Sequence, residues 1–183
     1  METTSGSKLN LNAAIAGAFA IVALIFAIND GNWYLIFKTI HVTFVVIWVG
    51  GGMFLTILAL LAQRTQNPTE LATVARQAAW AGEKLFSRAA IVVLAAGVAM
   101  MINGSLDWGK FWVSFGLLGF ASTFIVGIGI LAPRSKKIVE LTETIGVEAP
   151  ETQAAIASLL VIARYDIAVL LLVILDMVLK PFS

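Results

Sequence analysis

The sequence predicts an all-α protein, a multi-pass transmembrane helical bundle with five spans and cytoplasmic helical extensions. Two observations predict this class. Hydrophobic residues make up 60% of the 183 residues and charged residues only 13%. The apolar residues gather in five segments, at about 11–28, 33–62, 86–102, 111–132 and 156–179, and a helical span needs about 20 such residues. Because one small water-soluble core cannot bury so much apolar surface, residues 1–183 are expected to form a single domain in the lipid bilayer.

Composition also excludes several functions. The net charge of +1 provides no strongly basic face, so nucleic acid is not an expected partner. The absence of cysteine excludes disulfides, thiolate metal sites and cysteine nucleophiles. A single histidine cannot build a multi-histidine zinc site within one subunit. Whether the protein is an enzyme stays open at this point.

The first two apolar segments predict an antiparallel helix pair. A short polar stretch, residues 1–10, precedes the first segment. No small-x-small cleavage site separates the first segment from the second, so we expect an uncleaved first membrane helix. Residues 29–32 (Asn-Asp-Gly-Asn) predict a tight turn, and residues 103–105 (Asn-Gly-Ser) predict another between the third and fourth spans. Short connections of this kind join antiparallel neighbours.

The two longer connections are expected to be helical. Residues 67–70 (Asn-Pro-Thr-Glu) predict an N-cap followed by a proline at the first helical position. The helix that follows is either an interfacial amphipathic helix or an extension of the third span, bent at Gly82. Apolar residues also continue the fourth span to Ile145, where Gly146 can end the helix, and Pro150 can begin the last one.

Basic residues predict the orientation. They concentrate in the two longer connections, at Arg64, Arg76, Lys84, Arg88, Arg134, Lys136 and Lys137. By the positive-inside rule, these connections and the N-terminus face the cytoplasm, and the C-terminus faces out. Small residues on three spans predict close helix packing; they are Gly119, Thr123 and Gly127, then Gly52 with Thr56, and Ala95 with Ala99.

His41, the only histidine, lies inside the second apolar segment, where a titratable ring needs a reason. At three- and four-residue spacing it shares one helix face with Lys38, Val45, Trp48 and Gly52. This face could hold a planar cofactor ring, with His41 as a haem iron ligand and Trp48 and Lys38 as further contacts. It could equally be a bundle seam in which the imidazole is hydrogen-bonded, or His41 could transfer protons.

A lone histidine limits how haem b could bind. It cannot supply both axial ligands, so a single subunit allows only a methionine partner or a five-coordinate iron. A histidine from a second subunit is the remaining arrangement, and it would require a homo-oligomer.

Depth along the helices predicts two groups of ion pairs. Lys38 and Asp176 lie roughly 7 Å and 6 Å below the outer interface, so they can pair if the second and fifth spans are neighbours. Arg88, Arg164 and Asp166 lie at a similar level near the inner headgroups and could form an ion network.

Several motifs carry a resemblance to a known family. They are residues 37–41 (Phe-Lys-Thr-Ile-His), residues 48–51 (Trp-Val-Gly-Gly) with Phe54, Trp108 with Trp112, and the closing Lys180-Pro181. Over most of residues 33–183 the chain resembles an uncharacterised bacterial family of predicted integral membrane proteins. That family is similar to the copper-resistance CopD domain and to HemJ, the membrane protoporphyrinogen oxidase. The resemblance implies the bacterial inner membrane and a haem-associated role for His41.

Together these observations predict a binding or accessory module that contacts haem or a redox partner through His41. The alternatives are a HemJ-like porphyrin-precursor oxidase, a small transporter, or a structural subunit. The expected partners are the lipid bilayer and either a second copy of the chain or a larger membrane complex.

Overall fold

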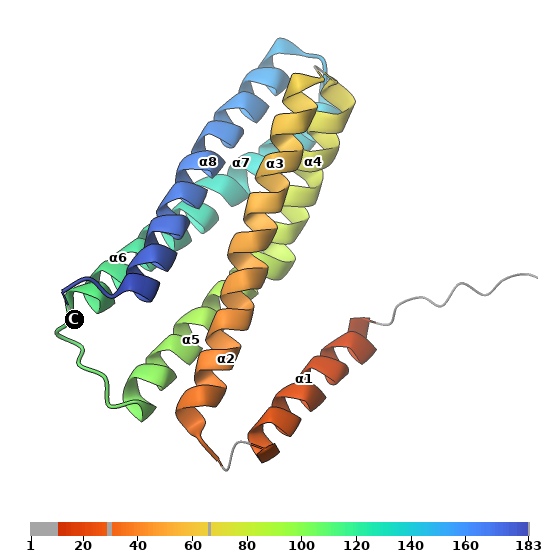
Figure 1. Ribbon diagram of the computed structural model, residues 1–183. Coiled ribbons are helices and arrows are strands. Elements are labelled where there is room, and N and C mark those ends of the chain that lie inside the picture. The colour runs from red at the N-terminus through yellow and green to blue at the C-terminus, as the bar shows by residue number, and fades with distance from the viewer. Residues whose placement is uncertain (1–10, 29–30, 66, 183) are drawn as a thin grey trace, which may run out of the picture.

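The computed structural model describes residues 11–28, 31–65 and 67–182, and this part of the chain is all-α (Figure 1). The predicted polar start and part of the predicted turn at residues 29–32 lie outside the described residues. The helices are α1 (Leu11–Ile28), α2 (Trp33–Val45), α3 (Gly51–Arg64), α4 (Pro68–Ala81), α5 (Ser87–Asn103), α6 (Phe111–Val126), α7 (Ala132–Thr144) and α8 (Pro150–Leu179).

Four helices, rather than the predicted five, are long and apolar enough to cross a membrane: Trp33–Arg64, Pro68–Asn103, Phe111–Thr144 and Pro150–Leu179. The first predicted span, 11–28, corresponds to α1. Its described apolar part is Gly17–Phe26, which rises only about 15 Å, half the hydrocarbon thickness of about 30 Å. In Figure 1, α1 lies beside α2 and away from the other helices.

The predicted helix boundaries in the longer connections are confirmed. The Asn67 side chain accepts hydrogen bonds from the backbone N–H groups of Thr69 and Glu70, at 3.1 and 3.2 Å. The helix that begins there continues into the third predicted span, so it is an extension rather than a separate interfacial helix. At the other connection Gly146 adopts φ +90°, and α8 begins at Pro150.

Three of the long helices contain a five-residue π-helical turn near the middle. These turns are η1 (Val46–Gly50) between α2 and α3, η2 (Gly82–Phe86) between α4 and α5, and η3 (Gly127–Leu131) between α6 and α7. A π turn holds more residues than an α turn, so it rotates the residues that follow it relative to the α-helical pattern. Faces predicted from α-helical spacing therefore do not continue across these turns.

The long helices pack differently in their two halves (Figure 1). In one half, α2 packs mainly against α5, and α6 packs against α8. In the other half, α3, α4, α7 and α8 form a four-helix bundle. The core of this bundle is a cluster of buried apolar residues: Ala59, Ala62, Leu71, Ala75, Ile138, Ile156, Leu159 and Leu160.

Glycines allow the close approach of the helix pairs. A Cβ at Gly97 of α5 would lie 3.1 Å from His41 Nδ1, and one at Gly104 would lie 2.7 Å from the Tyr34 ring. On α6, a Cβ at Gly119 would overlap Val173 of α8. Of the residues predicted to pack closely on this helix, Gly119 and Thr123 do so, whereas Gly127 faces open space.

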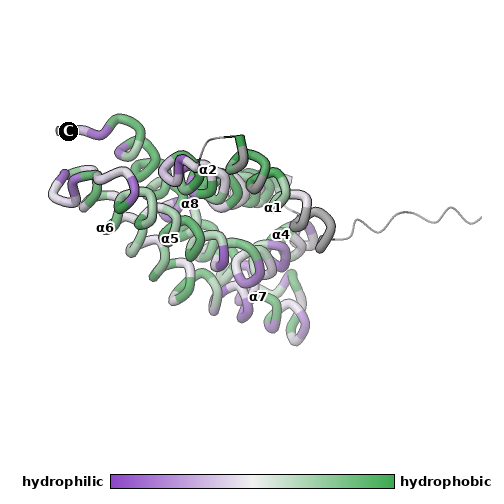
Figure 2. Tube along the Cα trace, turned by 90° about the horizontal axis from the view of Figure 1, so that it is seen from below, coloured by the Kyte–Doolittle hydropathy of each residue, from purple (hydrophilic) through white to green (hydrophobic). Residues whose placement is uncertain are grey.

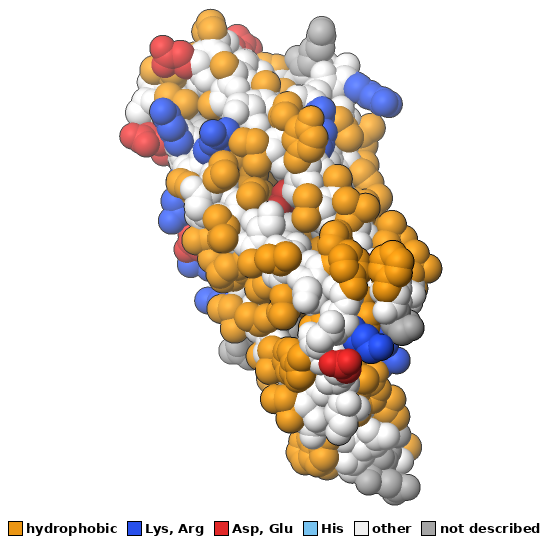
Figure 3. Space-filling view, turned by 90° about the vertical axis from the view of Figure 1, so that its left-hand side faces the viewer, with side chains coloured by type: hydrophobic (Ala, Val, Ile, Leu, Met, Phe, Trp, Pro, Cys, Tyr) orange, Lys and Arg blue, Asp and Glu red, His pale blue; other side chains and the backbone are white. Residues whose placement is uncertain are grey.

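The surface is consistent with membrane insertion. The long helices have 30 to 36 residues and so measure roughly 45–54 Å, longer than the hydrocarbon layer. Hydrophilic residues gather on α4 and α7, whereas α2, α5 and α6 are mostly hydrophobic (Figure 2). In Figure 3, charged side chains gather toward one end and hydrophobic side chains cover most of the remaining face. The end that carries α4 and α7 therefore extends beyond the lipid.

The four spans predict which connections share a side of the membrane. Because the natural chain has no cysteine, single cysteines can report accessibility. We expect Ser105→Cys and Glu148→Cys to react with a membrane-impermeant maleimide from opposite sides, since one span separates them. Ala96→Cys, at a buried position, is the unreactive control. Labelling of both exposed positions from the same side would contradict the four-span topology.

Candidate functional site

A cavity of about 380 Å³ lies between the four long helices. The three π turns contribute Trp48, Gly82 and Gly127 to its wall, and α8 contributes Asp166 and Ile167. The volume falls in the range of cavities that hold small molecules. Gly82 and Gly127 have open space where a Cβ would lie, so these glycines help to keep the cavity empty of side chains.

The cavity is bounded at both ends along the bundle. At one end its wall includes Ala59, Ala75 and Leu160, which also belong to the apolar cluster of the four-helix bundle. Toward the other end lies Trp48, whose ring packs edge-on against Phe120 with 5.7 Å between ring centroids. This aromatic contact joins the first and third long helices between the α2–α5 and α6–α8 pairs.

The mouth of the cavity is assigned to the rim between η2 and α7, because charged lining residues there are exposed. Glu83 and Lys136 both line the cavity, and their side chains are 48% and 69% exposed. Lys136 Nζ lies 3.6 Å from Glu83 Oε2, and Lys84 Nζ lies 2.6 Å from Glu83 Oε1. On the face drawn in Figure 3, an acidic side chain lies in a recess among hydrophobic ones. The cavity thus has apolar walls and a charged rim.

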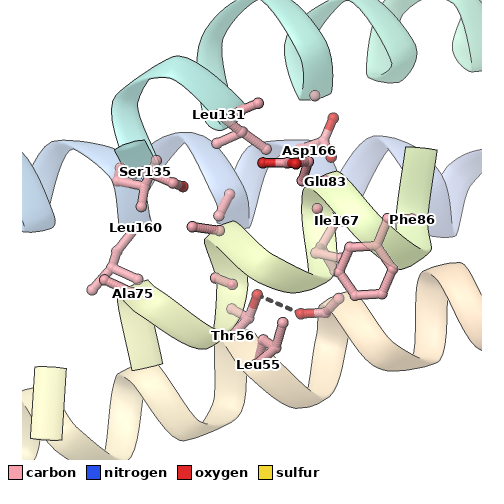
Figure 4. Close-up of a pocket in the computed structure, with 18 of the residues that line it drawn as sticks. Leu55, Thr56, Ala75, Glu83, Phe86, Leu131, Ser135, Leu160, Asp166 and Ile167 are labelled. Carbon is pink, nitrogen blue, oxygen red and sulfur yellow. Dashed lines mark hydrogen bonds between the residues drawn. The ribbon is translucent and has the colours of Figure 1, made fainter. Parts of the chain in front are cut away.

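Asp166 also lines the cavity and, unlike Glu83 and Lys136 at the rim, forms no ion pair among the described residues. Its Oδ1 is buried and has no hydrogen-bond partner among the described residues. Figure 4 shows its carboxyl group between the helices, near Leu131 and Glu83. Asp166 as a whole is half-buried, but a carboxylate oxygen removed from water without a hydrogen-bond donor is costly. The Oδ1 atom therefore marks a place where a donor is missing.

The hydroxyl groups of the cavity do not supply that donor. Thr56 donates to the Gly52 carbonyl at 2.9 Å (the dashed line in Figure 4), and Thr123 donates to the Phe120 carbonyl at 3.0 Å. Both hydroxyls therefore bind the backbone of their own helices.

His41 lies outside the cavity, at the contact between α2 and α5. Its Nδ1 is 2.8 Å from the carbonyl oxygen of Val93. Because a carbonyl only accepts, Nδ1 carries the hydrogen and donates. The ring packs against Gly97, which gives it room. The hydrogen-bonded seam, one of the interpretations left open by the sequence, describes this geometry.

The structure does not bring the predicted His41 face together as one site. Trp48 lines the cavity while His41 contacts α5, because Trp48 lies within the η1 turn, which rotates the helix face relative to α2. The Lys38 ammonium lies 6.0 Å from the ring centroid of Tyr34, which is also on α2. Lys38 is therefore not joined to Trp48 in one site.

The predicted pair of Lys38 with Asp176 is not formed. The two residues lie on different helix pairs, since α2 packs mainly against α5 and α8 against α6. Asp176 is only 6% exposed, and neither carboxylate oxygen has a hydrogen-bond partner among the described residues. It lies beside Gly116 of α6, where a Cβ would be 3.9 Å from Oδ2.

The predicted network of Arg88, Arg164 and Asp166 is also not formed among the described residues. Arg164 instead donates to Gln63 Oε1 at 2.6 Å, on the first long helix. The described ion pairs are those of Glu83 with Lys84 and Lys136. Nor does the described part of the chain contain a group of three or more metal-ligating side chains.

Sequence reasoning missed Gly97 and Phe120 as partners of the predicted residues. Depth offered a signal for Gly97. Counted from Asn103 it lies roughly 9 Å below the outer interface, close to the roughly 12 Å of His41. No spacing signal pointed to Phe120, because its contact with Trp48 depends on the η1 turn.

Four long apolar helices and a cavity between them define a multi-pass integral membrane protein in contact with the lipid bilayer. The chain belongs to the family described as predicted integral membrane protein (DUF2269), whose model matches residues 35–181. No curated protein and no solved structure matches it. The family expected from the sequence is therefore confirmed, and the similarity to CopD and HemJ finds no support.

The α2–α5 contact predicts a coupling between His41 and Gly97. We expect Gly97→Leu to lower the free energy of unfolding by about 1–3 kcal/mol, because the larger side chain displaces the imidazole. In a His41→Ala background the same change should cost clearly less. Gly50→Leu, at an open position, is the control. Unfolding in mixed micelles measures all variants, and an equal cost of Gly97→Leu in both backgrounds would contradict the contact.

Proposed function

We propose that this membrane protein is a binding module that holds a small, mostly apolar molecule in the cavity between its four long helices. The cavity itself carries the proposal. Protein interiors are close-packed and rarely leave voids larger than a water molecule. The cavity between these four helices measures about 380 Å³. π turns are frequent at functional sites, and three of them line it.

The position of the cavity favours a ligand that comes from the lipid. Counted from Phe111, Gly127 lies roughly 24 Å along its helix, which is in the half of the bilayer nearer the basic connections. The mouth between η2 and α7 opens to the side of the bundle rather than along its axis. Counted from Asn103, Glu83 lies roughly 30 Å along its helix, so the charged rim is at the headgroup level of that leaflet, where an amphiphilic molecule from the lipid would reach it.

We further propose the bacterial cytoplasmic (inner) membrane as the location, with the basic connections in the cytoplasm and the C-terminus outside. The positive-inside rule supports this orientation. The predicted cytoplasmic N-terminus required a fifth span before Trp33. With four candidate spans and the basic connections in the cytoplasm, the first span begins at Trp33 on the outer side. The cysteine labelling described above, done on intact cells, tests it: Ser105→Cys should react and Glu148→Cys should not.

A matched pair of glycine variants tests the ligand site. Gly127 and Gly50 both lie in π turns and both have open space for a side chain, but only Gly127 lines the cavity. We expect native mass spectrometry of the wild-type protein, released in native lipid particles, to show a bound small molecule. Gly127→Leu should lose this mass and Gly50→Leu should keep it. A wild-type protein without any bound mass would contradict the proposal.

A haem or redox-partner contact through His41 is a second candidate. One observation favours it: Nδ1 is held by the Val93 carbonyl, an arrangement that orients an imidazole for ligation through Nε2. The described residues supply only this ligand. Met101 and Met177, two methionines on the outer side, pack with Trp112. A haem pocket would therefore need a second copy of the chain or another subunit of a membrane complex, with Lys38 as a further contact.

The absorption spectrum tests this second candidate. Protein from haem-replete cells should show a Soret band, and His41→Ala should shift or abolish it because the iron loses its ligand. Lys110→Ala, which changes a lysine outside the helices, is the control. A wild-type spectrum without this band, unchanged after haem addition, would rule out the haem contact.

The other functions considered from the sequence gain less support. A transporter needs polar groups through both leaflets, but Asp166 and Asp176 are separated by roughly 15 Å along α8, and the residues between them are apolar. A HemJ-like oxidase depends on a similarity that the comparisons do not support. A structural subunit would leave the cavity without a purpose.

A further inference from the structure

Two acidic groups line the cavity, and Asp166, unlike Glu83 at the rim, forms no ion pair among the described residues. Asp166 Oδ1 is buried without a hydrogen-bond donor among the described residues. It lies among apolar neighbours, including Leu131 and Ile167, as Figure 4 shows. A molecule in this cavity must therefore either donate a hydrogen bond to Asp166 Oδ1 or leave this buried oxygen without a partner, which is unfavourable.

Four hydroxyl side chains line the cavity, and none of them donates to Asp166 Oδ1: three are engaged elsewhere, and the fourth is Ser135. Thr56, Ser87 and Thr123, which line the cavity, donate to backbone carbonyls of their own helices. Lys136 is drawn to Glu83 at the mouth, and Arg164 donates to Gln63. The fold thus places a carboxylate in a mostly apolar cavity, where no described side chain donates to its Oδ1.

Charge complementarity then decides the class of occupant. An anionic molecule would be repelled by Asp166, and a purely apolar one would leave its oxygen unpaired. A protonated amine supplies both the opposite charge and N–H donors, and charge-assisted hydrogen bonds are stronger than neutral ones. A hydrocarbon portion suits the apolar walls.

We propose that the ligand of this cavity is a hydrophobic amine, held by an ion pair between its protonated nitrogen and Asp166. This inference rests on the proposed binding function and names the chemical class of its ligand. Glu83 at the mouth adds a second acidic group on the route of entry, and its two lysine partners limit the net charge there.

Decylamine and decan-1-ol are the probes for this proposal, because they share the hydrocarbon chain and differ in charge. Binding to purified protein in nanodiscs is measured by native mass spectrometry at equal probe concentration in the lipid. We expect the wild-type protein to bind decylamine about tenfold or more tightly than decan-1-ol. Asp166→Asn should remove this preference by weakening decylamine binding alone.

Two further variants separate the amine proposal from the cavity proposal. Asp176→Asn changes a buried carboxylate on α8 that does not line the cavity, and should leave both probes unaffected. Gly127→Leu should weaken both probes, because it fills the shared space.

Equal binding of the two probes to the wild-type protein, lost in Gly127→Leu, would overturn the amine proposal and leave the cavity as the ligand site. Binding that Gly127→Leu does not change would overturn both proposals. The comparison of the two probes on the wild-type protein does not depend on the folding of any variant. For the variants, helical content from circular dichroism confirms that the fold is retained.

Discussion

Close packing of helices at glycines is the interaction on which this structure depends. Within lipid, burial of apolar surface gives little drive for helices to associate, so short-range packing must provide it. Gly97 of α5 and Gly104, which directly follows α5, are seven residues apart, and they receive His41 and Tyr34, which are seven residues apart on the antiparallel α2. Gly116 and Gly119 hold α6 against α8 in the same way. These two pairs diverge, and the cavity lies where they join the four-helix bundle.

The sequence predicted most of the fold because apolar length and helix-ending residues act locally. The cap at Asn67 and the end at Gly146 depend on a few neighbouring residues, so they were predictable. The π turns were not, since an extra residue in a turn leaves no periodic signal. They explain why the face from His41 to Trp48 does not form one site. The first predicted span was wrong for another reason: its described apolar part, Gly17–Phe26, is too short to cross the hydrocarbon layer.

The candidate site was harder to predict than the fold. His41 attracted attention as a titratable ring in an apolar segment, and its geometry is that of a hydrogen-bonded contact between helices. Asp166 was expected in an ion network because it lies at a similar depth to Arg88 and Arg164. Depth along a helix does not show toward which neighbouring helix a side chain points. In the structure it lines the cavity, while its neighbour Arg164 turns to Gln63. The cavity is assembled from four helices distant in sequence, so no local pattern could have revealed it.

Two carboxylates of α8, the half-buried Asp166 and the buried Asp176, show why the space around a group matters as much as the group. Neither Asp166 nor Asp176 has a complete set of donors among the described residues. Asp176 lies in the close α6–α8 contact beside Gly116, where there is no room for a ligand. Asp166 lies in the wall of a cavity with a lateral mouth. Of the two carboxylates, only Asp166 can therefore recognise a ligand, because only Asp166 can be reached by a hydrogen-bond donor from outside the protein.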